Sequence, residues 1–275
     1  MPAPSALSSR LIDLARDAAA AIVEVHRRGF TVTDKADSSP LTEADLASNR
    51  VLIAGLAGIE PLLPVISEES LSVPWATRAG WSRYWLVDPL DGTKEFVGGN
   101  DHFTVNIALI DDGRPTLGIV VQPLTGTGWI GEVGSGAWRI EADGRTTALR
   151  CDALGEAPLR VAVSRSHAGG STARFLAGLG PHVCVATGSS LKLCHIADGH
   201  LDLYPRPAPT MEWDIGAGQA VLEAAGGRVV VASGEALAYN RKDSLLNDHF
   251  VAVGDQALID RDDGALLRML VDACR

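Results

Sequence analysis

The sequence has few of the features that mark membrane, secreted or zinc-binding proteins. It contains no apolar run long enough to cross a bilayer, and its N-terminus has no basic segment followed by an apolar core. Its four cysteines show no paired spacing typical of a zinc site or a disulfide framework. We therefore expect a cytoplasmic protein with reduced, mostly buried thiols, and leave peripheral contact with a membrane surface open.

Positive charge is also scarce. The 24 Lys and Arg residues are outnumbered by 34 Asp and Glu residues, which gives a net charge of −10 and argues against a nucleic-acid-binding surface. A negative protein still binds phosphates where metal ions reverse the local field. With 46% hydrophobic and 21% charged residues, the 275-residue chain has an ordinary globular composition and can bury a substantial core.

The first part of the chain pairs two helices with a run of strands. Apolar spacing predicts a helix from a cap at Ser8 or Ser9 to Gly29, a polar hairpin-like segment over 31–39, and a second helix over 40–58. Thr42 and Asp45 resemble a capping box at the start of that second helix. Apolar runs separated by short turns then predict an antiparallel sheet with strands at 64–67, 84–87, 103–110, 117–121, 128–133 and 137–140.

The pattern changes near residues 152–158. Beyond this point, strands at 160–164, 183–186, 201–204, 229–231 and 250–253 alternate with helices at 171–179, 189–198, 214–225 and 265–274. Such alternation favours a mixed or parallel sheet covered on both faces. We predict a layered α/β protein with two domains, residues 1–155 and 156–275.

The stretch from Asp88 to Thr93 carries the strongest chemical signal. It follows the apolar run 84–87, so a strand there delivers Asp88 and Asp91 to one edge of the sheet. Two carboxylates this close repel unless a cation lies between them, and hard divalent ions prefer oxygen ligands. Gly92 permits a tight turn, and Thr93 could cap a short helix whose free N–H groups suit a phosphate. The alternative is a solvated surface turn, because Asp, Pro and Gly are ordinary turn formers.

Three further acids stand where elements begin or end. Glu68 follows a predicted strand, and Asp45 and Asp214 lie in the first turns of helices. Each has a structural alternative, since acids at helix starts cap free N–H groups and match the helix dipole. The seven histidines are scattered, and the adjacent Cys194 and His195 are not spaced as metal ligands, which favours a packed helix for both.

Three segments together resemble a known family. The segments 67–70, 88–96 and 212–220 resemble, in order, the three signatures of the inositol monophosphatase superfamily of magnesium-dependent, lithium-sensitive phosphatases. The interval of 20 residues from Glu68 to Asp88 is similar as well. This resemblance implies an αβαβα sandwich, in which an antiparallel N-terminal sheet and a mixed C-terminal sheet flank the site.

Within this superfamily, the chain most resembles the CysQ branch, the 3′(2′),5′-bisphosphate nucleotidases. The similar segments are 93–96, 103–110, 164–167, 188–192 and 203–206. Inositol monophosphatases usually carry an acid seven places before the last aspartate, where this chain has Pro207. The resemblance therefore favours a nucleotide substrate over an inositol phosphate.

The resemblance also implies roles for individual residues. The implied ligands of two or three Mg²⁺ ions are Glu68, Asp88, the carbonyl of Leu90, Asp91 and Asp214. Asp45 and Thr93 resemble the pair that orients and deprotonates the attacking water, and the backbone of Gly92 and Thr93 would hold the scissile phosphate. The implied contacts to the rest of the substrate are Ser164, Arg165, His167, Ser189, Ser190, Lys192 and Arg206.

Simpler explanations stay open for part of this set. Lys192 and Arg206 could be surface charges, and His167 a capping or solvated histidine. The predicted reaction is removal of the 3′-phosphate of adenosine 3′,5′-bisphosphate, giving AMP and phosphate. The alternatives are a phosphatase for inositol or another small sugar or polyol phosphate, and a nucleotide-binding regulatory protein without catalysis. We predict no nucleic-acid partner and no integral membrane segment, and leave a homodimer open.

Overall fold

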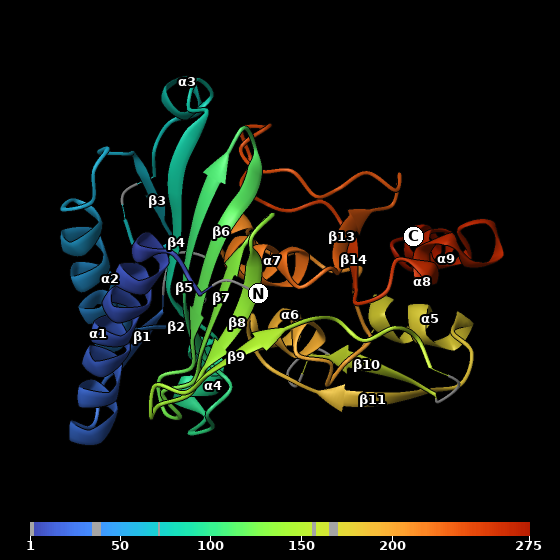
Figure 1. Cartoon of the computed structure of the whole chain (residues 1–275), viewed down its shortest axis with the longest axis horizontal. Helices are drawn as coiled ribbons and strands as arrows, with labels where there is room; N and C mark the ends of the chain where they lie inside the picture. The colour runs from blue at the N-terminus through green and yellow to red at the C-terminus, as the bar shows by residue number, and fades with distance from the viewer. Residues whose placement is uncertain (1–2, 35–39, 71, 156–157, 165–169) are drawn as a thin grey trace.

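The computed structural model describes residues 3–34, 40–70, 72–155, 158–164 and 170–275. Within this part of the chain, helices and sheets alternate in five layers (Figure 1). A helix pair, a seven-stranded sheet, a second helix pair, a five-stranded sheet and a last group of helices follow one another across the molecule. The predicted αβαβα sandwich is confirmed.

The first layer consists of α1 (Ala6–Arg28) and α2 (Glu43–Leu56). Ser5 caps α1, because its hydroxyl accepts the N–H of Ser8 at 3.2 Å. The prediction of a cap at Ser8 or Ser9 is wrong, since Ser8 is buried in the first turn and its hydroxyl donates to Glu132. The chain between the two helices contains the short antiparallel strands β1 (Val32–Asp34) and β2 (Pro40–Thr42). The predicted hairpin-like segment lies largely outside the described residues.

The second layer is a seven-stranded sheet. Its strands lie in chain order: β3 (Val65–Ser67), β4 (Arg83–Asp91), β5 (Thr104–Asp111), β6 (Arg114–Val121), β7 (Gly128–Glu132), β8 (Gly136–Ile140) and β9 (Thr146–Leu149). Neighbouring strands run antiparallel, except that β3 and β4 are parallel. The prediction of a purely antiparallel sheet is therefore wrong at this edge. The chain between β3 and β4, which includes α3 (Trp75–Arg78), returns to the starting end of the sheet instead of forming a hairpin.

Both faces of this sheet are covered. Buried apolar residues of α1 and α2 pack on one face, and α7 (Glu212–Ala224) packs on the other. Gly118 on β6 and Gly131 on β7 allow α7 to approach closely, because a side chain at either position would overlap the backbone of α7 at Ala217 or Val221. This close contact sets the position of the N-terminus of α7 beside the end of β4.

The substitution Gly118→Ala tests this contact. We expect it to lower the free energy of unfolding by about 1–3 kcal/mol, because the added methyl group has no space and meets backbone that cannot rotate away. Urea unfolding measures the change. Gly80→Ala is the matched control, since nothing lies within 4 Å of the added carbon there. Equal stability of the two variants would contradict the close packing of α7 on β6.

The second sheet has five strands in the order β11 (His182–Ala186), β10 (Leu159–Val163), β12 (Leu203–Arg206), β14 (Phe250–Val253) and β13 (Arg228–Val231). The first three are parallel, and the pairs that involve β14 are antiparallel, so the predicted mixed sheet is confirmed. Apolar residues of α5 (Ser171–Gly178), α8 (Ala257–Asp260) and α9 (Ala265–Ala273) cover one face. The other face packs against α6 (Leu191–Ala197) and α7.

Three further expectations concern the whole chain. Cys194 is buried, but Cys184 on the edge strand β11 and Cys274 after the last helix are exposed, so the prediction of mostly buried thiols is wrong for these two. In the part of the chain that the structure describes, no helix is long and apolar enough to span a membrane. The division into domains after residue 155 stays a prediction.

Candidate metal and phosphate site

The site begins at the irregular end of β4. Asp88 pairs with Asn106 on β5, and Asp91 pairs with Thr104, so β4 contains one extra residue between them. Residues three apart in a regular strand point to opposite faces, whereas a one-residue bulge returns them to the same side. The bulge is held by the Ser48 hydroxyl, which donates to the carbonyl of Pro89 at 2.7 Å. It thereby brings the two carboxylates together.

Helix α7 adds a third carboxylate. One oxygen each of Asp88, Asp91 and Asp214 lie within 4.8 Å of one another, and we call these three residues the acidic cluster. Asp214 is fixed by the N–H of Met211, which donates to its Oδ2 atom at 2.9 Å. The alternative that Asp214 caps a helix is therefore correct, because its Oδ2 atom accepts the N–H of Met211 at the start of α7. The same carboxylate is also part of the acidic cluster.

The acidic cluster is electrostatically unfavourable without a counter-charge. Burial raises the pKa of Asp88 well above its usual range, and the negative charges of Glu68, Asp91 and Asp214 raise it further. Burial and the charge of Asp91 raise the pKa of Asp214 in the same way. The donor atoms are all oxygens, which suits a hard divalent cation. The cluster can therefore hold a metal ion.

The predicted pair Asp45 and Thr93 is in contact beside this cluster. The Thr93 hydroxyl donates to Asp45 Oδ1 at 3.1 Å, and its oxygen lies 3.4 Å from the carbonyl of Leu90. The second oxygen of Asp45 accepts the N–H and the hydroxyl of Thr42 at 2.8 and 2.6 Å, which completes the predicted capping box of α2. Asp45 is 1% exposed. One carboxylate thus caps a helix with one oxygen and holds Thr93 with the other.

The turn after the acidic cluster leads into α4 (Thr93–Val97). Gly92 is the cap of this helix and has a left-handed backbone with φ of 94°. A side chain at Gly92 would also come within 3.1 Å of the carbonyl oxygen of His102, so this position requires glycine. The prediction that Thr93 caps α4 is wrong, because Thr93 is the first helical residue and its hydroxyl bonds Asp45.

Residues at the start of α6 approach the acidic cluster from the second sheet. The Ser189 hydroxyl and the Ser190 N–H both donate to Asp91 Oδ2 at 2.7 Å. The Ser190 hydroxyl in turn donates to Asn106 on β5 at 2.8 Å. In this structure, the two serines orient Asp91, and their predicted contact with substrate stays a prediction.

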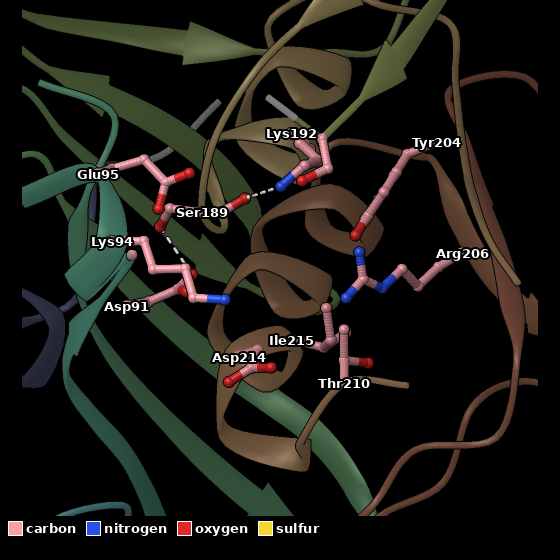
Figure 2. A pocket seen from close by; sticks show the side chains of 12 residues that line it. Asp91, Lys94, Glu95, Ser189, Lys192, Tyr204, Arg206, Thr210, Asp214 and Ile215 are labelled. Carbon is pink, nitrogen blue, oxygen red and sulfur yellow. Dashed lines mark hydrogen bonds between the residues drawn. The ribbon is translucent and has the colours of Figure 1, made fainter. Parts of the chain in front are cut away.

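The pocket beside Asp91 is lined by cations on its other side. Figure 2 shows Lys192 from α6 and Arg206 from β12 extending toward the pocket, across from Asp91. Lys192 is 6% exposed, and its ammonium group donates to the carbonyl of Ser189 at 2.8 Å and lies 5.2 Å from the ring centre of Tyr204. Burial lowers the pKa of Lys192 to about 8, against the opposing charge of Asp91. The interpretation of Lys192 as a surface charge is therefore wrong.

This arrangement agrees with comparisons to known proteins. The sequence model of the inositol monophosphatase family matches residues 4–259. The chain belongs to the inositol monophosphatase family. The predicted family is thus confirmed.

Relatives within the family support the predicted branch. The chain is 44% identical to the Escherichia coli K12 protein named 3′(2′),5′-bisphosphate nucleotidase CysQ, over 88% of this chain and 97% of the relative. It is 33% identical to the CysQ protein of Haemophilus influenzae, over 85% and 87% of the two chains. The crystal structure of CysQ from Bacteroides thetaiotaomicron has a TM-score of 0.79 and 34% identity, over 90% and 97% of the two chains. The Thermotoga maritima IMPase has 22% identity and a TM-score of 0.76, and the match covers 96% of this chain and 97% of that chain. The two proteins share the fold.

The fold brings most of the predicted family residues into one region. The pocket lining includes the predicted residues Asp91, Gly92, Ser164, Ser189, Lys192, Arg206 and Asp214. Arg165 and His167 lie outside the described residues. Five lining residues were not predicted, namely Lys94, Glu95, Tyr204, Thr210 and Ile215. Lys94, Glu95 and Tyr204 belong to segments that resemble the CysQ branch, and Ile215 belongs to the family signature at 212–220. Lys94 points into the pocket in Figure 2, so the similar segments contain the signal that could have found these four residues.

Proposed function

We propose that the chain is a Mg²⁺-dependent phosphatase that removes the 3′-phosphate of adenosine 3′,5′-bisphosphate, giving AMP and inorganic phosphate. The observation that carries this proposal is that negatively and positively charged side chains lie on different sides of one pocket. The acidic cluster lies on one side, and Lys192 and Arg206 lie on the other. Such a pocket suits a substrate with two phosphate groups. The names and 44% identity of the CysQ relatives support the same substrate class.

The cation ligands that we propose are Glu68, Asp88, the carbonyl of Leu90, Asp91 and Asp214, for two or three Mg²⁺ ions. Carboxylate and carbonyl oxygens are the ligands that Mg²⁺ prefers. When bound, Mg²⁺ supplies positive charge that neutralises a phosphate and lowers the pKa of a water molecule. Burial and the neighbouring negative charges raise the pKa of Asp88, and a bound cation would offset both effects by attracting the ionised carboxylate.

Asp45 and Thr93 would act as the proton acceptor. The attacking water gives a proton to the Thr93 hydroxyl as Thr93 passes its own proton to Asp45 Oδ1, along the existing 3.1 Å hydrogen bond. The water oxygen would bond to phosphorus as the bond from phosphorus to the 3′-oxygen breaks. The 3′-oxygen would then take a proton from a solvent water molecule and leave as the 3′-hydroxyl of AMP. The hydrogen bonds from Thr42 hold the Asp45 carboxylate in position during this transfer.

The proposal is tested by phosphate release with Mg²⁺, comparing adenosine 3′,5′-bisphosphate with inositol 1-phosphate at matched concentrations. We expect a strong preference for the bisphosphate, abolished by EDTA and reduced by lithium. A preference for inositol 1-phosphate would overturn the substrate assignment and leave the metal assignment intact. Binding of the bisphosphate without turnover of either compound would instead support a regulatory nucleotide-binding protein.

The substitution Lys192→Met tests the second phosphate site. We expect KM for the bisphosphate to rise about 10- to 100-fold with little change in kcat, because a charge-assisted hydrogen bond contributes about 1.5–3 kcal/mol. In the wild-type protein, affinity for the bisphosphate should fall as the pH rises through about 8, since Lys192 then loses its charge. The variant should lack this pH dependence.

Two comparisons make the Lys192 test specific. A nucleoside 3′-monophosphate has no second phosphate, so its KM should be the same for wild type and variant. Lys242→Met is the matched control, because Lys242 is exposed and pairs with Asp248 outside the pocket. Equal losses with both substrates would show that Lys192 acts by positioning Ser189 and Asp91 rather than by binding the second phosphate.

A further inference from the structure

A second group of metal-ligating side chains lies at the C-terminal end of α6. His195 is in the last turn of this helix, Asp198 is its cap, and His200 follows two residues later. One ligand atom of each lies within 4.8 Å of the ligand atoms of the other two. We call these three residues the α6 cluster. It contains none of the residues that line the phosphate pocket.

Two atoms of the α6 cluster are buried and have no hydrogen-bond partner among the residues that the structure describes. Asp198 Oδ1 is 2.6 Å from His200 Nδ1, which is a hydrogen bond. Asp198 Oδ2 and His195 Nδ1 face each other at 3.5 Å and make no hydrogen bond. The side chain of Asp198 is only 4% exposed. Buried polar atoms are almost always satisfied, so a facing pair of unsatisfied ligand atoms needs an explanation.

The position of Asp198 increases the need for a positive charge. The C-terminal end of a helix carries a partial negative charge, so a buried carboxylate there is unfavourable unless a cation is close.

We propose that His195, Asp198 and His200 bind a divalent transition-metal ion of the zinc class. Two imidazole nitrogens and one carboxylate oxygen suit such an ion, whereas Mg²⁺ prefers sites made only of oxygen. Ligand atoms about 2.1 Å from a tetrahedral zinc ion are about 3.4 Å apart. The observed 3.5 Å between His195 Nδ1 and Asp198 Oδ2 fits this separation.

The third ligand and the entry path come from His200. Its side chain is 65% exposed, so it can exchange its hydrogen bond for coordination, and the ion can enter from solvent on that side. In the ion-bound form, both imidazoles present the Nδ1 lone pair and carry their proton on Nε2. His195 is held in place by an edge contact with Trp129 on β7, with ring centres 6.1 Å apart.

This site would be chemically separate from the acidic cluster and independent of the proposed reaction. The ion would link the last turn of α6 to the chain that follows it. Because an ion that binds only the folded state stabilises that state, Zn²⁺ should raise the Tm of the Mg²⁺-saturated protein. Of this group, only His195 was considered from the sequence, next to Cys194. The signal that could have identified the group is the presence of Asp198 and His200 three and five residues after His195.

The test uses NMR of the histidine ring nitrogens in the Mg²⁺-saturated full chain, with Zn²⁺ added to one equivalent. We expect the Nδ1 signals of His195 and His200 to shift and that of His182 to stay unchanged. Ring signals of His195 and His200 that do not respond to Zn²⁺ would overturn the proposal, because all bound Zn²⁺ would then lie elsewhere, for example at the acidic cluster.

Variants provide a second readout. His195→Gln and His200→Gln should each bind Zn²⁺ at least about 10- to 100-fold more weakly in competition with a coloured chelator, and should lose the Zn²⁺-dependent rise in Tm. Their phosphate release with Mg²⁺ should be unchanged. His182→Gln is the matched control, because His182 bonds only the carbonyl of Gly180 among the hydrogen bonds that the structure gives it. Variants that bind Zn²⁺ as tightly as this control would overturn the assignment.

Discussion

Replacing Asp91 with Asn is expected to lower phosphate release about a thousandfold or more and to leave the fold intact. The substitution removes one negative charge from the acidic cluster at nearly constant volume. A bound metal ion contributes several kcal/mol of transition-state stabilisation, and a thousandfold loss corresponds to about 4 kcal/mol. The amide oxygen can still accept a hydrogen bond from Ser189 or Ser190, so the surrounding structure keeps a partner.

Thermal unfolding separates the loss of metal binding from a loss of structure. In EDTA, the Asp91→Asn variant should have a higher Tm than the wild type, because one of the mutually repelling carboxylates is gone. Mg²⁺ should raise the Tm of the wild type by mass action and have little effect on the variant. Asp111→Asn should behave as wild type, because Asp111 is a half-exposed acid that pairs with Arg83 away from the acidic cluster. A variant at position 91 that keeps most of its activity would contradict the ligand assignment.

Local sequence patterns were sufficient for most of the fold. The continuous apolar runs of β5 and β6 predict strands that are buried on both faces, and the apolar stripe of α1 predicts a helix that is buried on one face. Short elements such as α3, α8 and β9 were missed. Three of the four residues of β9 are exposed, so the strand lacks an alternation of apolar and polar residues, and it forms through pairing with β8.

Two features of the central sheet depend on contacts that no local pattern contains. Pro89 has no N–H group for pairing in a sheet, which favours the end of a strand at this residue. The strand β4 nevertheless continues to Asp91, because Pro89 lies in a bulge where the regular pairing with β5 is interrupted. The parallel pairing of β3 with β4 similarly depends on the path of the intervening chain. Both features decide where Glu68, Asp88 and Asp91 lie, so the geometry of the site required the tertiary structure.

The sequence predicted the location of the candidate site where one short motif contains several of its residues. The segment from Asp88 to Thr93 identified the end of β4, and the capping alternative for Asp45 was also correct, since that residue completes a capping box. What the sequence could not show is that one oxygen of the Asp45 carboxylate caps α2 while the other accepts the hydroxyl of Thr93. The burial of Lys192 and the use of Ser189 and Ser190 to orient Asp91 were likewise hidden, because they result from packing α6 of the second sheet against β4 and β5 of the first.

Replacing Asp45 with Asn should separate proton transfer from metal binding. We expect kcat to fall about 10²- to 10⁴-fold, the usual contribution of a general base, because an amide cannot take the proton of Thr93. The rise in Tm with Mg²⁺ should remain, since Asp45 is not among the proposed cation ligands. This combination differs from that expected for Asp91→Asn, in which activity and the Mg²⁺ effect are lost together.

The helix cap complicates the Asp45 experiment, and Glu43→Gln provides the matched control. Glu43 is an acid in the same first turn of α2, pairs with Arg28 at the surface, and lies outside the site. Both substitutions remove a charge that favours a helix N-terminus, worth about 0.3–1 kcal/mol, so both should lower stability slightly. Because Glu43 does not contact Thr93, its variant should keep full activity. If the two variants lost activity equally, the loss would come from the helix start, and Asp45 would have no role in proton transfer.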